Sequence, residues 1–206
     1  MSLISFLGAS SRTRVHRHIG SSVSRGLSGG FSYQPRPLAA IVKLDLLSSE
    51  TPERVKEIWE GYHADKEFNI AETWTAAEFE TFKASRVSAG GLFIFPVPRD
   101  DGHFIVLTQV EEKHILFTYL KDYKEDPQGA QPYLVVTFYD ELASGDVTGP
   151  VLVRGEITPL TLDVQESSRL LGLVKEAYME GSEDVASFNK GTFDFEKHVN
   201  RMLKEE

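Results

Sequence analysis

Between residues 92 and 157 the chain carries five short apolar runs that are separated by polar turn sequences. The runs are rich in Val, Ile, Phe, Thr and Tyr, residues that are typical of β-strands. They cover residues 92–95, 103–110, 114–120, 133–139 and 151–157. Asp100-Asp101-Gly102 lies between the first two runs and Glu111-Glu112-Lys113 between the next two, and short turn sequences of this kind join antiparallel strands as hairpins. The pattern therefore predicts an antiparallel meander of about five strands.

Helical periodicity flanks this stretch on both sides. A Thr-Pro pair at residues 51–52 predicts the start of one helix, and a capping box at residues 75–78 predicts the start of a second. Asp163 and Glu166 form a similar pattern before a third helix, and a fourth is expected over residues 195–204. The first helix should pack on the sheet through a stripe of Val55, Ile58, Trp59 and Tyr62. Helices before and after a meander predict an α+β fold.

The predicted strands do not alternate cleanly between apolar and polar residues. In the second strand Val106 and Val110 share one face, whereas Ile105, Leu107 and Gln109 share the other. A sheet with two apolar faces either has helices on both sides or keeps part of one face for a partner. The predicted helices would cover one face well and the other only in part, so the pattern leaves both interpretations open.

Composition and charge exclude several classes of protein. The 206 residues are 41% hydrophobic and 11% aromatic, as in a globular protein, and no apolar run has the roughly 18 residues that span a bilayer. The chain contains no cysteine, which excludes disulfides and thiolate metal sites. Residues 1–40 carry five Arg and no acidic residue, so the rest holds 17 of the 22 basic residues against all 31 acidic ones. That body, with a net charge of −14, would repel nucleic acid.

The basic N-terminal segment has the composition of a mitochondrial transit peptide. Its first forty residues include nine Ser and five Arg, and Arg25-Gly26-Leu27-Ser28 is typical of a processing site with cleavage after Leu27. A disordered basic tail is the alternative. In either case we expect residues 1–37 to lie outside the fold and residues 38–206 to form one α+β domain.

The motifs of nucleotide-binding and hydrolytic enzymes are missing. The chain has no Gly-Lys-Ser/Thr phosphate loop, no Gly-x-Gly-x-x-Gly, no Gly-x-Ser-x-Gly and no His-Glu-x-x-His sequence. We therefore expect neither catalysis nor a bound cofactor.

One enzymatic alternative remains, and it involves histidine. His103 and His114 begin successive predicted strands, and with Asp101 they would supply the two-His-one-carboxylate set of an organellar hydrolase or metalloenzyme. The competing interpretation is that both are hydrogen-bonded residues at strand ends and that Asp101 belongs to a turn. Arg154 and Glu156 share one face of a strand, where a solvated ion pair is expected.

An ordered series of short sequences between about Lys43 and Asp194 resembles one known family. The series comprises Glu57-Ile58-Trp59, Tyr62-His63, Lys66, Phe93-Ile94-Phe95-Pro96-Val97-Pro98-Arg99, Gly102, Gln109, His114, Leu116-Phe117-Thr118-Tyr119-Leu120, Tyr123-Lys124, Ala130-Gln131-Pro132, Tyr139-Asp140-Glu141-Leu142 and Val151-Leu152-Val153-Arg154-Gly155-Glu156. This series is similar to that of the mitochondrial ATP synthase assembly factors that chaperone the beta subunit of the catalytic head.

The resemblance implies a monomeric chaperone of the mitochondrial matrix that binds the unassembled beta subunit and prevents its aggregation until the alpha subunit replaces it. Such a protein needs no cofactor. The candidate partner-binding residues are Pro96, Pro98, Arg99 and Gln109. A guanidinium that follows two prolines is held out on a stiff turn, and interfaces favour Arg, although a solvated loop charge is the alternative for Arg99.

The composition of the arm makes a prediction that can be tested directly. Residues 1–40, fused to a fluorescent reporter, should direct its import into mitochondria with cleavage near Leu27, because an Arg-rich segment without acids responds to an inside-negative potential. Microscopy and N-terminal sequencing of the imported reporter would check both points. A reporter that stays in the cytosol would contradict the targeting hypothesis.

Overall fold

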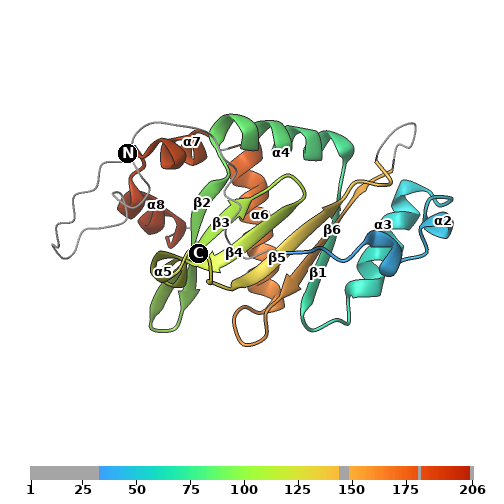
Figure 1. The fold of residues 1–206 in the computed structure, drawn as a ribbon, viewed down its shortest axis with the longest axis horizontal. Coiled ribbons are helices and arrows are strands. Elements are labelled where there is room, and N and C mark those ends of the chain that lie inside the picture. The colour runs from blue at the N-terminus through green and yellow to red at the C-terminus, as the bar shows by residue number, and fades with distance from the viewer. Residues whose placement is uncertain (1–32, 144–148, 181, 205–206) are drawn as a thin grey trace.

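A six-stranded antiparallel sheet runs through the middle of the molecule, with helices on both of its faces (Figure 1). The computed structural model describes residues 33–143, 149–180 and 182–204. The predicted cleavage site at Leu27 lies outside the described residues. The observed architecture confirms the predicted α+β class.

The strands form one sheet in the order β1-β6-β5-β4-β3-β2, in which every neighbouring pair is antiparallel. They are β1 (Asn69–Trp74), β2 (Leu92–Arg99), β3 (Gly102–Val110), β4 (His114–Tyr119), β5 (Pro132–Tyr139) and β6 (Val151–Ile157). Strands β2 to β6 are the predicted meander, including both hairpins. Strand β1 was not predicted, because only Ile70 and Trp74 of its six residues are large apolar residues that point to the core.

Helix α4 (Ala76–Ala89) carries the chain from one edge of the sheet to the other, because β1 and β2 are the two edge strands (Figure 1). Its 14 residues span about 21 Å, close to the roughly 24 Å that separate the first and last of six strands. The predicted capping box fixes its start, since Thr75 and Glu78 each accept a backbone hydrogen bond from the other.

The remaining helices divide between the two faces of the sheet. Together with α4, helices α6 (Val164–Met179) and α7 (Ser182–Lys190) cover the first face, and α8 (Phe195–Met202) packs beside β2. The second face is partly covered by a short 3-10 turn (Leu38–Ala40), α2 (Leu44–Leu47) and α3 (Pro52–His63). Helix α5 (Leu120–Glu125) follows β4 directly.

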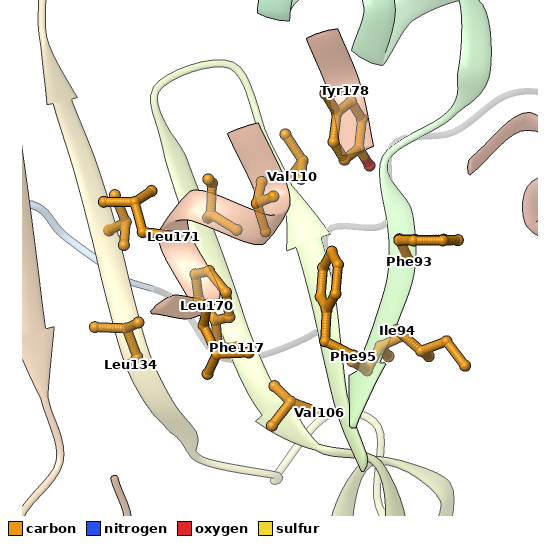
Figure 2. Packing of buried hydrophobic residues seen from close by; sticks show 14 of the residues in the cluster. Phe93, Ile94, Phe95, Val106, Val110, Phe117, Leu134, Leu170, Leu171 and Tyr178 are labelled. Atoms are coloured by element: carbon orange, nitrogen blue, oxygen red, sulfur yellow. The ribbon is translucent and has the colours of Figure 1, made fainter. Parts of the chain in front are cut away.

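The larger core fills the space between the sheet and α6. Figure 2 shows Phe95, Phe117 and Leu134 from three different strands, together with Leu170 and Leu171 from the helix. All five side chains are buried. At the other end of α6, Tyr178 donates a hydrogen bond to the carbonyl of Gly90, which fixes the helix to the start of β2.

A smaller core on the second face is built around Trp59 of α3. Its ring is fully buried and its indole N–H donates to the carbonyl of Val153 in β6 at 3.0 Å. The buried row of α3 continues from Val55 through Trp59 to His63, in steps of four residues. The prediction that Tyr62 is buried was therefore wrong, since Tyr62 lies off this row and is 49% exposed.

The fully buried position of Trp59 predicts a large effect of truncation. Trp59→Ala should lower the free energy of unfolding by about 3–5 kcal/mol, because a large cavity remains and the hydrogen bond from the indole to the Val153 carbonyl is lost. Urea denaturation would measure the loss, with Val87→Ala on the exposed side of α4 as a control that should change little. An unchanged midpoint for Trp59→Ala would show that α3 does not pack as described.

Candidate functional site

Three of the four candidate binding residues, Pro96, Pro98 and Arg99, lie in the edge strand β2. Alternate residues of this strand direct their backbone N–H and C=O groups away from β3, and these residues are Leu92, Ile94, Pro96 and Pro98. Asn189 of α7 hydrogen-bonds both the N–H and the C=O of Leu92, and His198 of α8 contacts the carbonyl of Ile94 at 3.3 Å. The prolines have no N–H to offer. This edge is therefore closed to the addition of another strand between residues 92 and 98.

Arg99, the third candidate, clamps the β2–β3 hairpin to the start of α6. Its guanidinium forms a two-point ion pair with Glu166, and Nη2 donates to the carbonyl of Thr161 at 3.4 Å. The same group lies 4.7 Å from the centre of the Phe104 ring. The Arg99 guanidinium is therefore already paired within the chain, and part of its side chain remains exposed.

Gln109, the fourth candidate, lies far from the other three. It is half-buried in β3 opposite Leu92, whereas Arg99 lies opposite Gly102. Seven residues of strand separate the two positions, or about 23 Å. The structure therefore does not bring the four candidate residues into one cluster.

The proposed histidine site is contradicted by the strand register. His103 lies at the start of β3 and His114 at the start of β4, and antiparallel neighbours start at opposite ends of a sheet. His114 lies beside Glu111, eight residues along β3 from His103, so about 26 Å separates the histidines. Among the described residues no group of three His, Asp or Glu side chains is arranged to hold a metal ion.

The sequence did not reveal that residues 33–37 form a strap across the second face of the sheet. The Tyr33 hydroxyl donates to Glu156 at 2.5 Å, and the Tyr139 hydroxyl donates to the Arg36 carbonyl at 2.8 Å. Both contacts join segments more than 100 residues apart, so no local sequence pattern could indicate them.

The strap explains why the prediction of a solvated Arg154–Glu156 pair was wrong. Arg154 is only 8% exposed, and its Nη1 lies 2.7 Å from a Glu156 carboxylate oxygen. This contact is an ion pair without hydrogen-bond geometry, and the Nε atom of Arg154 also has no hydrogen-bond partner. Burial opposes ionisation of Glu156, but the Tyr33 hydrogen bond and the Arg154 charge outweigh it and lower the pKa of Glu156. Burial and Glu156 raise the pKa of Tyr33 above its ordinary value, which keeps its hydroxyl a hydrogen-bond donor in alkaline solution as well.

A cavity of about 350 Å³ lies between α6, α8 and β2. Phe93 and Phe95 line it, and the carboxylates of Glu176 and Glu180 lie at its surface. His198 also lines the cavity, but its ring nitrogens contact the Ile94 carbonyl and Arg201, so it is not a free base. The described lining contains no Ser, Thr or Lys.

The Arg99 clamp predicts a measurable stability effect. Arg99→Gln should lower the free energy of unfolding by about 0.5–1 kcal/mol, as expected for a half-exposed ion pair. Arg99→Glu should cost more, because it places two carboxylates together at Glu166. Urea denaturation would test this, with Arg54→Gln as a control, since the Arg54–Glu57 pair is more exposed and local. Equal losses for Arg99→Gln and Arg54→Gln would contradict a clamp.

Comparison with known proteins identifies the family. The family model described as "ATP11 protein" matches residues 20–197. Two curated relatives are the ATP synthase mitochondrial F1 complex assembly factor 1 proteins of Homo sapiens and Mus musculus. The human protein is 25% identical over 157 residues, which cover 76% of this chain and 45% of the relative. The mouse protein is 23% identical over 169 residues, which cover 82% of this chain and 50% of the relative.

The chain thus spans about half the length of the curated relatives that it matches. The family model, by contrast, covers most of the chain, including every strand of the sheet and the helices from α2 to α7. On this evidence the chain belongs to the ATP11 protein family.

Proposed function

We propose that this protein assists assembly of the mitochondrial F1 complex by binding the unassembled beta subunit. It keeps that subunit soluble until the alpha subunit takes its place. The observation that carries the proposal is the family match over residues 20–197, together with the assembly role in the names of the two relatives. The choice of the beta subunit rests on the resemblance described from the sequence.

The mechanism that we propose is mass action. A subunit that is waiting for its neighbours exposes apolar surface that the finished complex buries, and such surface leads to aggregation. A factor that binds the free subunit, but not the assembled one, lowers the concentration of that surface and leaves when the true neighbour competes. This cycle needs no covalent step, which agrees with the lack of a phosphate loop in the sequence.

We propose that the protein acts in the mitochondrial matrix and that it is monomeric when free. The Arg-rich composition of residues 1–40 and the word "mitochondrial" in the names of the relatives support the location. No helix in the described part of the chain has the length and apolar character needed to cross a membrane. The hydrolase or metalloenzyme alternative is not proposed, because its His103 and His114 lie at opposite ends of the sheet.

The proposal predicts stoichiometric protection without nucleotide. The purified mature protein should suppress aggregation of isolated beta subunit at a ratio of about one to one, and added ATP should change nothing. Excess alpha subunit should displace it, because two ligands for one surface exclude each other. Light scattering would follow aggregation, with bovine serum albumin as a control for nonspecific protection. Failure to protect, or protection only with ATP turnover, would contradict the proposal.

The same assay tests the candidate contact residues Pro96, Pro98, Arg99 and Gln109, which remain proposals. Arg99→Gln is the informative change, because Arg99→Glu would also repel Glu166 and disturb the fold. If Arg99 contacts the subunit, a folded Arg99→Gln variant protects less well than the wild type. Equal protection would remove Arg99 from the interface.

A further inference from the structure

A row of polar side chains crosses the second face of the sheet beneath the strap. His114 of β4 lies opposite Thr137 of β5, and Thr137 lies opposite Arg154 of β6, so the three form one line across three strands. Glu156 lies two residues further along β6 and points to the same face as Arg154. Burial of polar groups in the middle of a doubly apolar sheet costs desolvation free energy. Packing alone therefore does not explain this polar row.

The strap covers the polar row mainly with one side chain. Tyr33 is half-buried, whereas residues 34–37 are exposed. The Tyr33 hydroxyl donates to Glu156 at 2.5 Å and lies 3.3 Å from the Thr137 hydroxyl. The centre of the Tyr33 ring lies 5.8 Å from that of the His114 ring. A single phenol thus makes contacts with three of the four side chains of the row.

The main chain of the strap is attached to the sheet much more loosely. The Tyr139 hydroxyl donates to the carbonyl of Arg36 at 2.8 Å. Among the described residues, no backbone–backbone hydrogen bond joins residues 33–36 to a strand. Pro35 and Pro37 have no N–H, and the φ of −56° and ψ of 141° at Pro37 are close to those of polyproline II. The strap therefore lies on the sheet as an extended peptide lies on a receptor, held by side chains and with its conformation preset.

The fit between the strap and the polar row is incomplete. Arg154 is 8% exposed, yet its Nε and Nη1 atoms have no hydrogen-bond partner in the described chain. The strap offers neither atom an acceptor, although it lies over the Glu156 carboxylate that pairs with this guanidinium. Buried donors without partners cost free energy in a purely structural contact. This arrangement favours a site that holds its segment reversibly.

We propose that the polar row is a binding site for an extended segment with a tyrosine followed by prolines, and that residues 33–37 occupy it as a ligand in cis. The segment that lies on the site is the chain's own, and it defines the chemistry of the ligand. That chemistry is a phenol that donates to Glu156 beside the His114 ring, on a polyproline-type backbone. Release of the strap opens the site, so the strap and a second segment of the same kind exclude each other. This inference does not depend on the function proposed above.

Binding of a strap peptide in trans tests the inference. A fluorescein-labelled peptide of residues 33–37 is titrated with the full chain, and fluorescence polarisation reports binding. Tyr33→Ala removes the side chain that fills the site, so this variant should bind the peptide at least tenfold more tightly than the wild type. In the wild type the tethered strap competes at a roughly millimolar effective concentration. A Tyr33→Phe peptide should bind the variant less well, because the hydrogen bond to Glu156 is lost.

A matched pair of substitutions locates the peptide on the polar row. In the Tyr33→Ala chain, Glu156→Gln should weaken peptide binding, because it removes the charged acceptor of the phenol. Glu112→Gln, in the exposed turn between β3 and β4, should leave binding unchanged. Equal effects of the two substitutions would contradict the proposed site.

A second measurement uses the wild type and needs no substitution. Chymotrypsin should cut the Tyr33–Gln34 bond at least tenfold faster than the bond after the fully buried Trp59, because release of the strap requires only local opening. Mass spectrometry would follow both products. Cleavage of the two bonds at the same rate would show that the strap is a fixed part of the fold. Equal peptide binding by wild type and Tyr33→Ala, or no binding by a Tyr33→Ala chain that melts as the wild type does, would also overturn the inference.

Discussion

The architecture depends on one constraint, that the central strands carry apolar side chains on both faces. In β4 and β5, Leu116 and Phe117 point to opposite sides, as do Val135 and Val136, and all four are buried. Such a sheet is stable in water only when both faces are covered. Helices α4, α6 and α7 cover the first face, and α3 with the strap at residues 33–37 covers part of the second. None of the exposed large apolar residues of the described chain lies within a strand.

This coverage limits how the protein can meet a partner. Because the strands are apolar on both faces, the sequence left open that one face of the sheet binds a partner. In the described structure the exposed large apolar residues lie instead on helices and at the ends of the sheet. The β2 edge is also closed, because the backbone positions that point away from β3 are two prolines, Pro96 and Pro98, and two residues, Leu92 and Ile94, whose backbone groups contact Asn189 and His198. Closure of the β2 edge also avoids the aggregation that an open edge strand invites.

The accuracy of the sequence predictions followed the range of the interactions involved. Caps, hairpins and strand periodicity are local, and the Thr75–Glu78 and Asp163–Glu166 capping boxes and the β2–β6 meander were predicted correctly. Strand β1 was missed because it has only two large apolar residues, Ile70 and Trp74, and its partner β6 lies more than 70 positions away, so no local pattern marks it.

The errors at the candidate site have the same origin. Arg154 could not be recognised as buried without the strap, whose Tyr33 lies 123 residues from Glu156. The histidine site failed because consecutive antiparallel strands start at opposite ends, which is a property of topology and not of spacing.

We propose that this chain forms a complex with a free subunit of the catalytic head and with no assembled form of it. Native mass spectrometry of the mature protein mixed with isolated beta subunit, isolated alpha subunit or intact catalytic head would test this proposal. Our account predicts a one-to-one complex with the beta subunit alone, which disappears as alpha subunit is added. A complex with the intact head, or no complex with the beta subunit, would contradict it.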